Sequence, residues 1–401
     1  MPRIVIAGCG FAGGVIALRS LQLGFDVTLL DVRRRDVGGV EIIPSSARHL
    51  LSDLRLDEAL TTIRPGYGVG MLRCLDGGVP EFREGRALHV DRLALRRAVI
   101  AEAASRGAKI RTLRQLPAPD AGAFASIDAT GRRAAWSHPV ERYGRSVADV
   151  FSAPGSASRF TALVVGLSEA WGYAAADEDG TTIGVIHDGR LPRLEIERAI
   201  RPKFGLAQDT LVIYLGRRPA FPQSAAAPLW GQVLAIGDAA FSHDPIGGRG
   251  LSFALGSAFA AAAVLQTWRD HPARWQRAAA YYADYVAAEK RRHLAFIFGD
   301  QKQAPQPVPS HVVWSGNEAR APLALEDGID VADVALTQAG TPVRWLGRFD
   351  VLELKAQCDS VQRTSDLIQT LGRRGFTAAE AAAIIDWALR NGLLRAAGPS
   401  V

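Results

Sequence analysis

The sequence predicts an α/β protein in which a parallel sheet is interrupted by an antiparallel sheet and followed by a small helical module. Three observations predict this arrangement. A short apolar run at 4–7 leads into a glycine-rich turn and then a helical segment. Between 139 and 229 the pattern changes to short strands separated by turns. A second apolar run at 232–236 leads into another glycine-rich turn, so the chain is expected to return to the first sheet.

The first turn carries Gly8, Gly10 and Gly13 in the pattern G-x-G-x-x-G. The first glycine of such a pattern allows a tight turn, the second lets the backbone approach a pyrophosphate, and the third lets the helix pack on the strand. The next strand ends at Asp31, 23 residues after Gly8, where an acid is placed to bind a ribose hydroxyl. Strand, turn, helix, strand and acid together predict a dinucleotide site of the Rossmann type.

The elements expected up to residue 135 alternate between strands and helices, which indicates a parallel sheet. They are a strand at 40–44, a helix at 45–54, a hairpin at 66–85, a helix that opens at 89–92 and ends near 106, and strands at 108–111 and 125–128.

Three neighbouring antiparallel strands are expected at 160–165, 170–174 and 181–186. Trp171 and Tyr173 alternate around a glycine in the second of them, so their side chains point to one face. Two interpretations stay open for this pair. Its members line an aromatic substrate pocket, or at least one of them belongs to the core of the sheet.

The C-terminal part is expected to begin with a linker at 301–335, because its start is polar and rich in proline. A winged-helix-like module is expected at 336–401, with helical patterns at 364–373, at 377–389 and at the 393–394 end. Thr377 and Glu380 form a capping box. The second of these helices contains acids but neither arginine nor lysine, which argues against a nucleic-acid partner.

Composition sets further bounds. The chain has 401 residues, 48% of them hydrophobic and 22% charged, which is typical of a globular protein. Its three cysteines are far apart and show no metal-ligand spacing, so neither a metal site nor a disulfide framework is expected. The N-terminus reads as a strand and not a signal peptide, and the apolar run at 251–265 is too short to span a bilayer. We therefore expect a cytoplasmic protein without a membrane partner.

Three separated segments together resemble the FAD-dependent class A monooxygenase superfamily, which has the PHBH fold. They are the first glycine turn, the run I-D-A-T-G at 127–131, and G-D-A-A followed by P-x-x-G-x-G at 237–250. The resemblance covers residues 1 to about 300. It implies a glutathione-reductase-type FAD domain at 1–135 and 230–300, with 40–88 contributing to the substrate side, and an antiparallel substrate domain at 136–229.

The same resemblance implies roles for single residues. Gly8, Gly10 and Gly13 would hold the FAD pyrophosphate, Asp31 the adenosine ribose, and Arg92 a phosphate or the ribityl chain. The I-D-A-T-G and G-D-A-A turns would add Asp128, Gly237 and Asp238, and Asp238 would bind a ribityl hydroxyl. The loop with Pro245, Gly248 and Gly250 would lie against the isoalloxazine ring. His243 and Asp244 in this loop are candidates for catalysis or for a plain loop turn, while Glu41 either faces the substrate or pairs with an arginine.

Within the superfamily the sequence is similar to the branch that includes the tryptophan halogenases. The similarity rests on 128–131, on Glu41-Ile42-Ile43-Pro44 and on the long aromatic helix after 272. True halogenases carry an essential lysine near the predicted hairpin and a W-x-W-x-I-P motif. Here no lysine precedes Lys109, and the corresponding strand reads W-G-Y-A-A-A. Halogenation therefore becomes the alternative, because hypohalous acid has no residue to guide it.

The resemblance thus favours hydroxylation of an electron-rich aromatic, an indole or tryptophan, by a flavin C4a-hydroperoxide formed with oxygen. The peptidyl-tryptophan hydroxylases of tryptophylquinone cofactor biogenesis also lack the lysine, and an added C-terminal module suits a peptide or protein substrate. Electrons would come from a reduced nicotinamide or a flavin reductase. Two further alternatives are a flavin reductase of the geranylgeranyl reductase kind and a flavin-sensing regulator that binds DNA.

Overall fold

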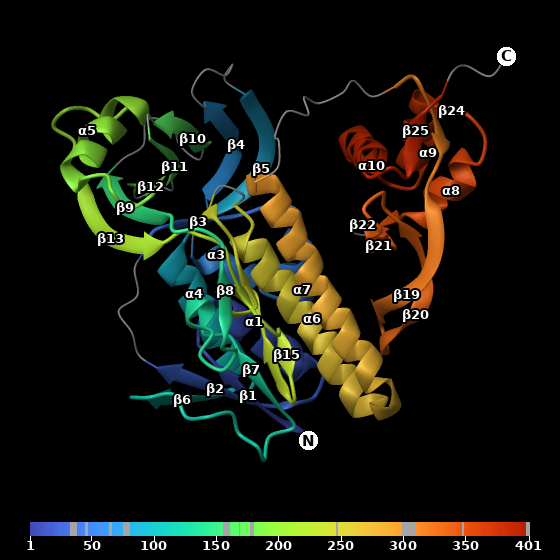
Figure 1. The fold of residues 1–401 in the computed structure, drawn as a ribbon, viewed down its shortest axis with the longest axis horizontal. Helices are drawn as coiled ribbons and strands as arrows, with labels where there is room; N and C mark the ends of the chain where they lie inside the picture. The colour runs from blue at the N-terminus through green and yellow to red at the C-terminus, as the bar shows by residue number, and fades with distance from the viewer. Residues whose placement is uncertain are drawn as a thin grey trace. The chain divides into compact units, whose positions relative to one another are not determined.

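The computed structural model describes residues 1–32, 38–44, 47–63, 66–74, 81–154, 161–167, 169–176, 180–245, 248–298, 309–346 and 349–397. The chain forms two compact units (Figure 1). The first comprises Met1–Pro272 and Tyr282–Leu294, and the second comprises Ala273–Tyr281 and Ala295–Val401. Three expected turns, at 33–35, 76–78 and 177–179, lie outside the described residues.

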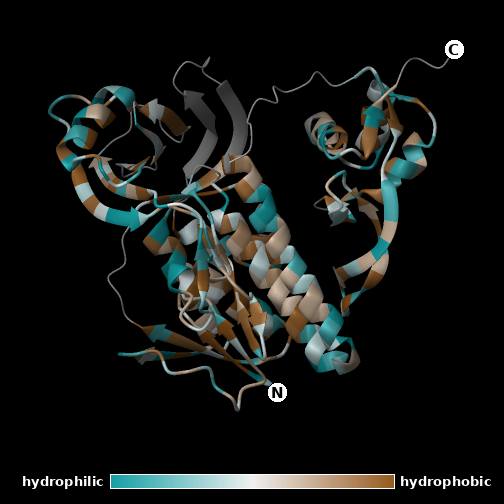
Figure 2. Ribbon diagram, in the orientation of Figure 1, coloured by the Kyte–Doolittle hydropathy of each residue, from teal (hydrophilic) through white to brown (hydrophobic). Residues whose placement is uncertain are grey.

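A six-stranded sheet forms the core of the first unit, in the order β15-β16-β7-β1-β2-β6. All neighbouring pairs are parallel except β15 with β16, which confirms the predicted parallel sheet. The hydrophobic colour along its inner strands in Figure 2 reflects their burial on both faces. The strands are β1 (Arg3–Ala7), β2 (Asp26–Val32), β6 (Lys109–Leu113), β7 (Ala125–Asp128), β15 (Leu229–Trp230) and β16 (Val233–Ala235).

The pairing of β16 with β7 confirms that the chain returns to the first sheet after the antiparallel strands. Three helices pack together beside this sheet, α1 (Phe11–Gln22), α4 (Arg92–Ser105) and α6 (Gly250–Asp270). The turns after β1, β7 and β16 and the end of β2 all lie at the carboxyl edge of the sheet. This is the edge where parallel α/β sheets bind ligands.

α6 extends beyond the apolar run at 251–265 and continues to Asp270. By length and composition it passes the test for a membrane span, so the expectation that it is too short is wrong. Residues such as Leu255, Ala258 and Leu265 are fully buried against the rest of the unit, as in a core helix.

An eight-stranded sheet carries the second layer, in the order β13-β9-β12-β11-β10-β4-β5-β3. The predicted hairpin forms, and the antiparallel pairing of β10, β11 and β12 is confirmed. The strands are β3 (Val40–Ile43), β4 (Gly66–Cys74), β5 (Glu81–Asp91), β9 (Val147–Pro154), β10 (Thr161–Leu167), β11 (Ala170–Ala176), β12 (Gly180–His187) and β13 (Ile213–Pro219).

One helix was not expected in this layer, α5 (Arg193–Lys203). Its buried residues Ile196 and Ile200 stand four residues apart and pack on Phe151, Val165 and Ile183 of the sheet. The i, i+4 spacing of these two isoleucines was visible in the sequence. It was not recognised as helical because the segments on either side have strand patterns.

A buried carboxylate connects three strands of this sheet. Asp149 on β9 accepts hydrogen bonds from His187 Nε2 at 2.9 Å and from the Tyr214 hydroxyl at 2.8 Å. It also accepts two from Arg217, whose Nε and Nη2 lie 3.0 and 2.8 Å from its oxygens. Burial raises the pKa of Asp149, but the hydrogen bonds from Arg217, Tyr214 and His187 outweigh it and hold the pKa below its usual value.

The remaining elements of the first unit are short, apart from one long helix that also contributes residues to the second unit. The helix expected at 45–54 forms as α2, and a second short helix, α3, follows it after Arg55, whose φ of 54° interrupts the helical backbone; Ser45 and Ser46 lie outside the described residues. The elements are α2 (Arg48–Asp53), α3 (Asp57–Thr62), η2 (Gly131–Arg133), β8 (Val140–Arg142), β14 (Gln223–Ala225), η3 (Gly237–Ala239), β17 (Phe241–Ser242), η5 (Pro272–Arg274) and α7 (Trp275–Phe298).

The second unit has its own core, in which Val312, Phe349, Leu354 and Ile385 are buried. A sheet of order β24-β18-β25 packs with three helices, in the chain order α8, β24, α9, α10, β25. The elements are β18 (His311–Trp314), β19 (Asn317–Leu325), β20 (Gly328–Leu336), β21 (Pro342–Val343), β22 (Trp345–Leu346), β23 (Phe349–Asp350), α8 (Leu352–Cys358), β24 (Gln362–Arg363), α9 (Thr364–Arg373), α10 (Ala378–Arg390) and β25 (Leu394–Ala396).

Two expectations for this unit are wrong. The linker expected at 301–335 contains β18, β19 and most of β20, because its alternating residues pair into hairpins. The 393–394 end is a strand and not a helix, because Gly392 with φ 72° stops α10 and Leu394 then pairs with Trp314. The capping box of Thr377 and Glu380 is confirmed.

Candidate cofactor and substrate site

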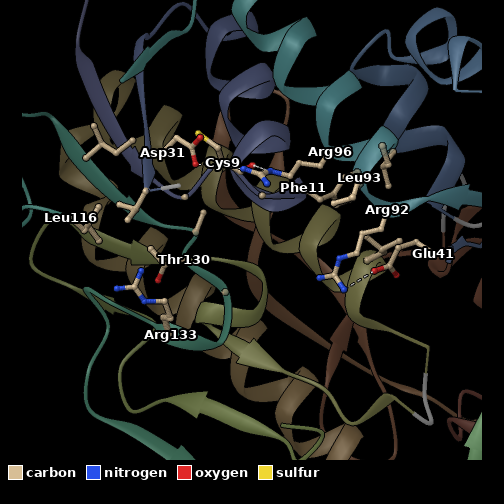
Figure 3. A pocket seen from close by; sticks show the side chains of 18 residues that line it. Cys9, Phe11, Asp31, Glu41, Arg92, Leu93, Arg96, Leu116, Thr130 and Arg133 are labelled. Carbon is tan, nitrogen blue, oxygen red and sulfur yellow. Dashed lines mark hydrogen bonds and ion pairs between the residues drawn. The ribbon is translucent and has the colours of Figure 1, made fainter. Parts of the chain in front are cut away.

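A cavity of about 290 Å³ opens at the carboxyl edge of the parallel sheet. Its lining comes from the turn after β1, the end of β2, β3, the start of α4, the turn after β7 and the start of α6. Figure 3 shows Asp31 and Arg96 together on one side of it and Arg92 with Glu41 on another. The predicted site residues that line this cavity are Gly8, Gly10, Asp31, Glu41 and Arg92.

At two glycines of the first turn, Gly8 and Gly13, the backbone leaves no space for a side chain. Gly8 has φ 109°, and a Cβ there would lie 2.3 Å from the Ala129 carbonyl oxygen. A Cβ on Gly13 would lie 1.9 Å from the Gly8 carbonyl oxygen, whereas one on Gly10 would meet no atom within 4 Å. Gly10 is the N-cap of α1, and no side chain caps this helix. Its first N–H groups are therefore available to an anion in the cavity.

The second glycine turn begins at Gly237, which lies beside α1. Gly237 has φ 54°, and a Cβ there would lie 3.0 Å from the Cβ of Ala12 in α1. Leu251 in the first turn of α6 lines the cavity together with Gly8 and Gly10. The first glycine turn and the start of α6, which are more than 200 residues apart in sequence, therefore both line one cavity. The cavity lining does not include Gly13, Gly237, Asp238, Pro245, Gly248 or Gly250.

Arg96 is a cavity residue that the sequence analysis missed. Its Nε donates to the Cys9 carbonyl oxygen at 2.6 Å, and its Nη2 lies 3.5 Å from Asp31 Oδ1. Arg96 follows Arg92 by four residues on α4, so both side chains lie on one face of the helix. That four-residue spacing was the signal in the sequence that could have identified Arg96 as a cavity residue. Burial, followed by the charge of Asp31, raises the pKa of the Cys9 thiol to about 12, so this thiol stays protonated.

Glu41 and Arg92 form an ion pair on the opposite side of the cavity, with Oε1 and Nη1 3.3 Å apart. Asp91 caps α4 by accepting a hydrogen bond from the Ala94 amide at 2.6 Å, which fixes Arg92 in the first turn. The two interpretations of Glu41 therefore both apply, since it lines the cavity and pairs with an arginine.

Trp171 and Tyr173 lie on the same face of β11, with their ring centroids 6.2 Å apart. Both are half-buried and pack against a small core cluster that includes Val150 and Ile186. Burial, followed by the negative charge of Glu41, raises the pKa of the Tyr173 hydroxyl above its usual value. β11 also contacts β3, the strand that carries Glu41.

Asp128 has a different role from the one that the resemblance implies. It does not line the cavity, and its carboxylate accepts from the Thr130 amide at 3.0 Å, the Thr130 hydroxyl at 2.6 Å and the Trp136 amide at 2.8 Å. These three bonds shape the turn whose Thr130 and Gly131 do line the cavity. Asp128 therefore acts on the site through the backbone.

The structure places His243 and Asp244 inside the protein and not on the cavity wall. His243 is 6% exposed, and its ring packs edge-on against Phe241, Phe253 and His293 at centroid distances of 4.6 to 5.3 Å. Its Nε2 lies 2.9 Å from Glu289 Oε1 on α7. His243 lines no part of the cavity, and its enclosed ring favours the loop-turn interpretation over catalysis.

The buried His293 makes stability depend on pH. It accepts a hydrogen bond from the Asp244 amide at 2.9 Å. Burial, followed by the charge of His243, lowers the pKa of His293 from its ordinary 6.5 to about 4. The unfolded chain therefore binds a proton between pH 6.5 and 4 that the folded chain does not bind, and stability is lost as the pH falls through this window.

We expect the unfolding free energy to fall by about 3 kcal/mol more in the wild type than in His293→Gln between pH 7 and 4, because each pH unit corresponds to about 1.4 kcal/mol. Urea titrations at a series of pH values measure this difference. The exposed His49 serves as a control, and His49→Gln should keep the wild-type pH dependence. A His293→Gln profile parallel to that of the wild type would contradict the assignment.

Among the residues that the structure describes, no group of three or more His, Cys, Asp or Glu is placed to hold a metal ion. The cavity instead offers backbone N–H groups, three arginines and two carboxylates. This donor set suits an anionic ligand that carries sugar hydroxyls.

No protein-family model matches the chain, and no curated protein matches it in sequence. Solved structures do match it. The peptidyl tryptophan dihydroxylase QhpG, essential for tryptophylquinone cofactor biogenesis, is 21% identical with a TM-score of 0.66, over 98% of this chain and 99% of that chain. CmlS, a flavin-dependent halogenase, is 14% identical with a TM-score of 0.71, over 98% of this chain and 95% of that chain. The chain has the flavin-dependent halogenase fold.

A third solved structure shares only part of the chain. Tar14, a tryptophan C-6 flavin-dependent halogenase (chlorinase) from taromycin biosynthesis, is 15% identical with a TM-score of 0.64, over 76% of this chain and 80% of that chain. The matches to QhpG and CmlS, which cover 98% of the chain, include the C-terminal unit as well. The predicted α/β fold with an antiparallel sheet is confirmed.

Proposed function

We propose that this protein is an FAD-dependent monooxygenase that hydroxylates an electron-rich aromatic ring, an indole, in a tryptophan-containing peptide or protein. The observation that carries the proposal is the cavity in which the turn of Gly8 and Gly10 meets the start of α6. A peptidyl tryptophan dihydroxylase shares this architecture over 98% of this chain and 99% of its own.

The residues of the cavity fit FAD. Gly13 and Gly8 leave no space for side chains, and Gly10 faces open space where a pyrophosphate would approach the N–H groups of α1. Asp31 would accept a ribose hydroxyl, while Arg92 and Arg96 would offset the phosphate charge. Bound FAD would supply the activation of oxygen. We assign electron supply to a reduced nicotinamide or a flavin reductase, and the enzyme to the cytoplasm.

The chain's own residues would act on the substrate side of the cavity. The N-terminal end of α6, which has no acidic residue in its first turn, would stabilise negative charge that develops beside Leu251. Trp171 and Tyr173 would stack on the indole, and the Glu41 carboxylate, held by Arg92, would accept the proton that leaves the hydroxylated ring carbon.

Halogenation is the second candidate, since CmlS and Tar14 are halogenases of the same fold. The positions of the lysines argue against it. No lysine precedes Lys109 in the sequence. Lys109 lies at the amino edge of the sheet, opposite the cavity, where it pairs with Asp26 at 2.9 Å. Lys290 pairs with Glu141 at 2.7 Å.

The test is mass spectrometry of a turnover mixture that holds the purified protein, FAD, a flavin-reducing system, oxygen and bromide. Free tryptophan and a tryptophan-containing precursor polypeptide are offered as substrates. We expect the polypeptide to gain one or two oxygen atoms and no halogen. A brominated product would promote the second candidate. Release of hydrogen peroxide without a product from either substrate would overturn the indole assignment and leave FAD binding in place.

A further inference from the structure

One buried carboxylate on α7, that of Glu289, contacts both ends of the segment that joins β17 to α6. Its Oε1 lies 2.9 Å from His243 Nε2 and accepts from Arg249 Nε at 2.7 Å. Its Oε2 accepts from Arg249 Nη2 at 3.1 Å and from Arg292 Nη1 at 2.9 Å. His243 begins the segment 243–249 and Arg249 ends it as the N-cap residue of α6. A single side chain therefore fastens both ends.

Two further contacts hold the beginning of segment 243–249. Arg132 Nη2 donates to the His243 carbonyl oxygen at 3.0 Å, and the Asp244 amide donates to His293 Nε2 at 2.9 Å. Arg132 belongs to η2, directly after Thr130 and Gly131 of the cavity wall. The segment is therefore connected to the cavity at both ends, through Arg132 and through Leu251 of α6.

The Glu289 carboxylate is both buried and ionised. Its side chain is 8% exposed. Burial raises the pKa of Glu289, but the hydrogen bonds from His243 and Arg249 outweigh it and bring the pKa to about 2. The carboxylate is thus ionised at neutral pH. A buried ion pair adds little net stability, and its better attested effect is to select one conformation.

We infer that Glu289 is a positioning residue of the flavin reaction, which fixes the described ends of segment 243–249 (243–245 and 248–249) and the start of α6 at the cavity through His243 and Arg249. The inference rests on the proposed function in so far as FAD occupies this cavity. Correct placement of the α6 start keeps water from the reacting atoms and directs its N–H groups to developing negative charge. Substitution of Glu289 should therefore increase the fraction of reducing equivalents that ends as hydrogen peroxide.

The first test needs neither FAD nor substrate. Amide hydrogen exchange is measured by mass spectrometry on the FAD-free full-length protein, in peptides that cover 241–253. Glu289→Gln should accelerate exchange in these peptides about tenfold or more, because a buried hydrogen bond to a charged group contributes about 1.5–3 kcal/mol. The matched control is Lys290→Met on the same helix, since Lys290 pairs with Glu141 and Tyr143 instead of the segment. Equal exchange in Glu289→Gln and the control would overturn the inference.

A second variant keeps the test decisive if Glu289→Gln folds poorly. The Arg249 side chain is 43% exposed, so Arg249→Gln should fold normally. It should also accelerate exchange, and the double variant should be no faster than Glu289→Gln alone, because Arg249 acts on the segment through its contact with Glu289. The inference would be contradicted if the two substitutions together accelerated exchange by the product of their single effects. It would also be contradicted if Arg249→Gln left exchange unchanged.

The third readout uses the FAD-loaded enzyme. The fraction of consumed electrons that appears as hydrogen peroxide should rise about threefold or more in Glu289→Gln, with FAD affinity within about twofold of the wild type. Unchanged partitioning would overturn the positioning role. If the wild type binds no FAD, the proposed function fails, whereas the exchange measurement still reports whether Glu289 fixes the segment.

Discussion

Gly10→Ala is expected to weaken FAD binding by about tenfold to a hundredfold, which corresponds to about 1.4–2.8 kcal/mol, with unchanged thermal stability. In the FAD-free protein an added Cβ meets no atom within 4 Å, so the fold has no reason to change. The new methyl group would instead occupy the space through which a pyrophosphate reaches the α1 N–H groups. Fluorescence titration of FAD together with a thermal scan measures both quantities.

Gly13→Ala is the matched comparison, because its Cβ would lie 1.9 Å from the Gly8 carbonyl oxygen. The strand–helix contact must shift to accept it, so we expect a loss of about 1–3 kcal/mol of stability as well as weaker FAD binding. If Gly10→Ala binds FAD as tightly as the wild type, the assignment of the pyrophosphate to this turn is wrong.

Asp149→Ala is expected to destabilise the first unit by about 3–5 kcal/mol, because it leaves Arg217 and the buried His187 without their carboxylate. The three partners come from β12 and β13 and meet on β9, so their loss affects the sheet that carries Trp171 and Tyr173. Chemical unfolding followed by circular dichroism measures the change.

The control for this variant is Asp188→Ala in the same part of the chain. Asp188 is 57% exposed and pairs with the exposed Arg190, so its removal should change stability by less than about 0.5 kcal/mol. Similar losses in the two variants would contradict the structural role of the Asp149 network.

Much of the fold was predictable because its signals are local. The run at 4–7 with its three glycines specified β1, the turn and α1, and the capping box of Thr377 and Glu380 specified the start of α10. Local signals also predicted Gly8, Gly10 and Asp31 of the cavity lining, whereas Arg92 was a candidate through the family resemblance and Glu41 through its two open interpretations.

Other parts depend on contacts between residues far apart in sequence. Glu289 is 46 residues from His243, and no spacing rule connects a helix residue to a loop at that distance. His243 read as a catalytic candidate because its position in the loop was visible, while the aromatic rings that enclose it were not. Leu394 became a strand residue through pairing with Trp314, about 80 residues earlier in the chain.

The parallel sheet is completed late during synthesis, because its strands lie far apart in the sequence. Roughly 225 residues separate Ala7 of β1 from Val233 of β16. Translation at about 5–20 residues per second needs roughly 10–45 s to cover that distance. Once β7 at 125–128 has been made, its edge stays open until residue 232 follows, because the Ser126 amide later donates to the Gln232 carbonyl oxygen. A ribosome that stalls before residue 233 therefore carries an aggregation-prone nascent chain without a finished nucleotide cradle, which is a client for chaperones and proteases.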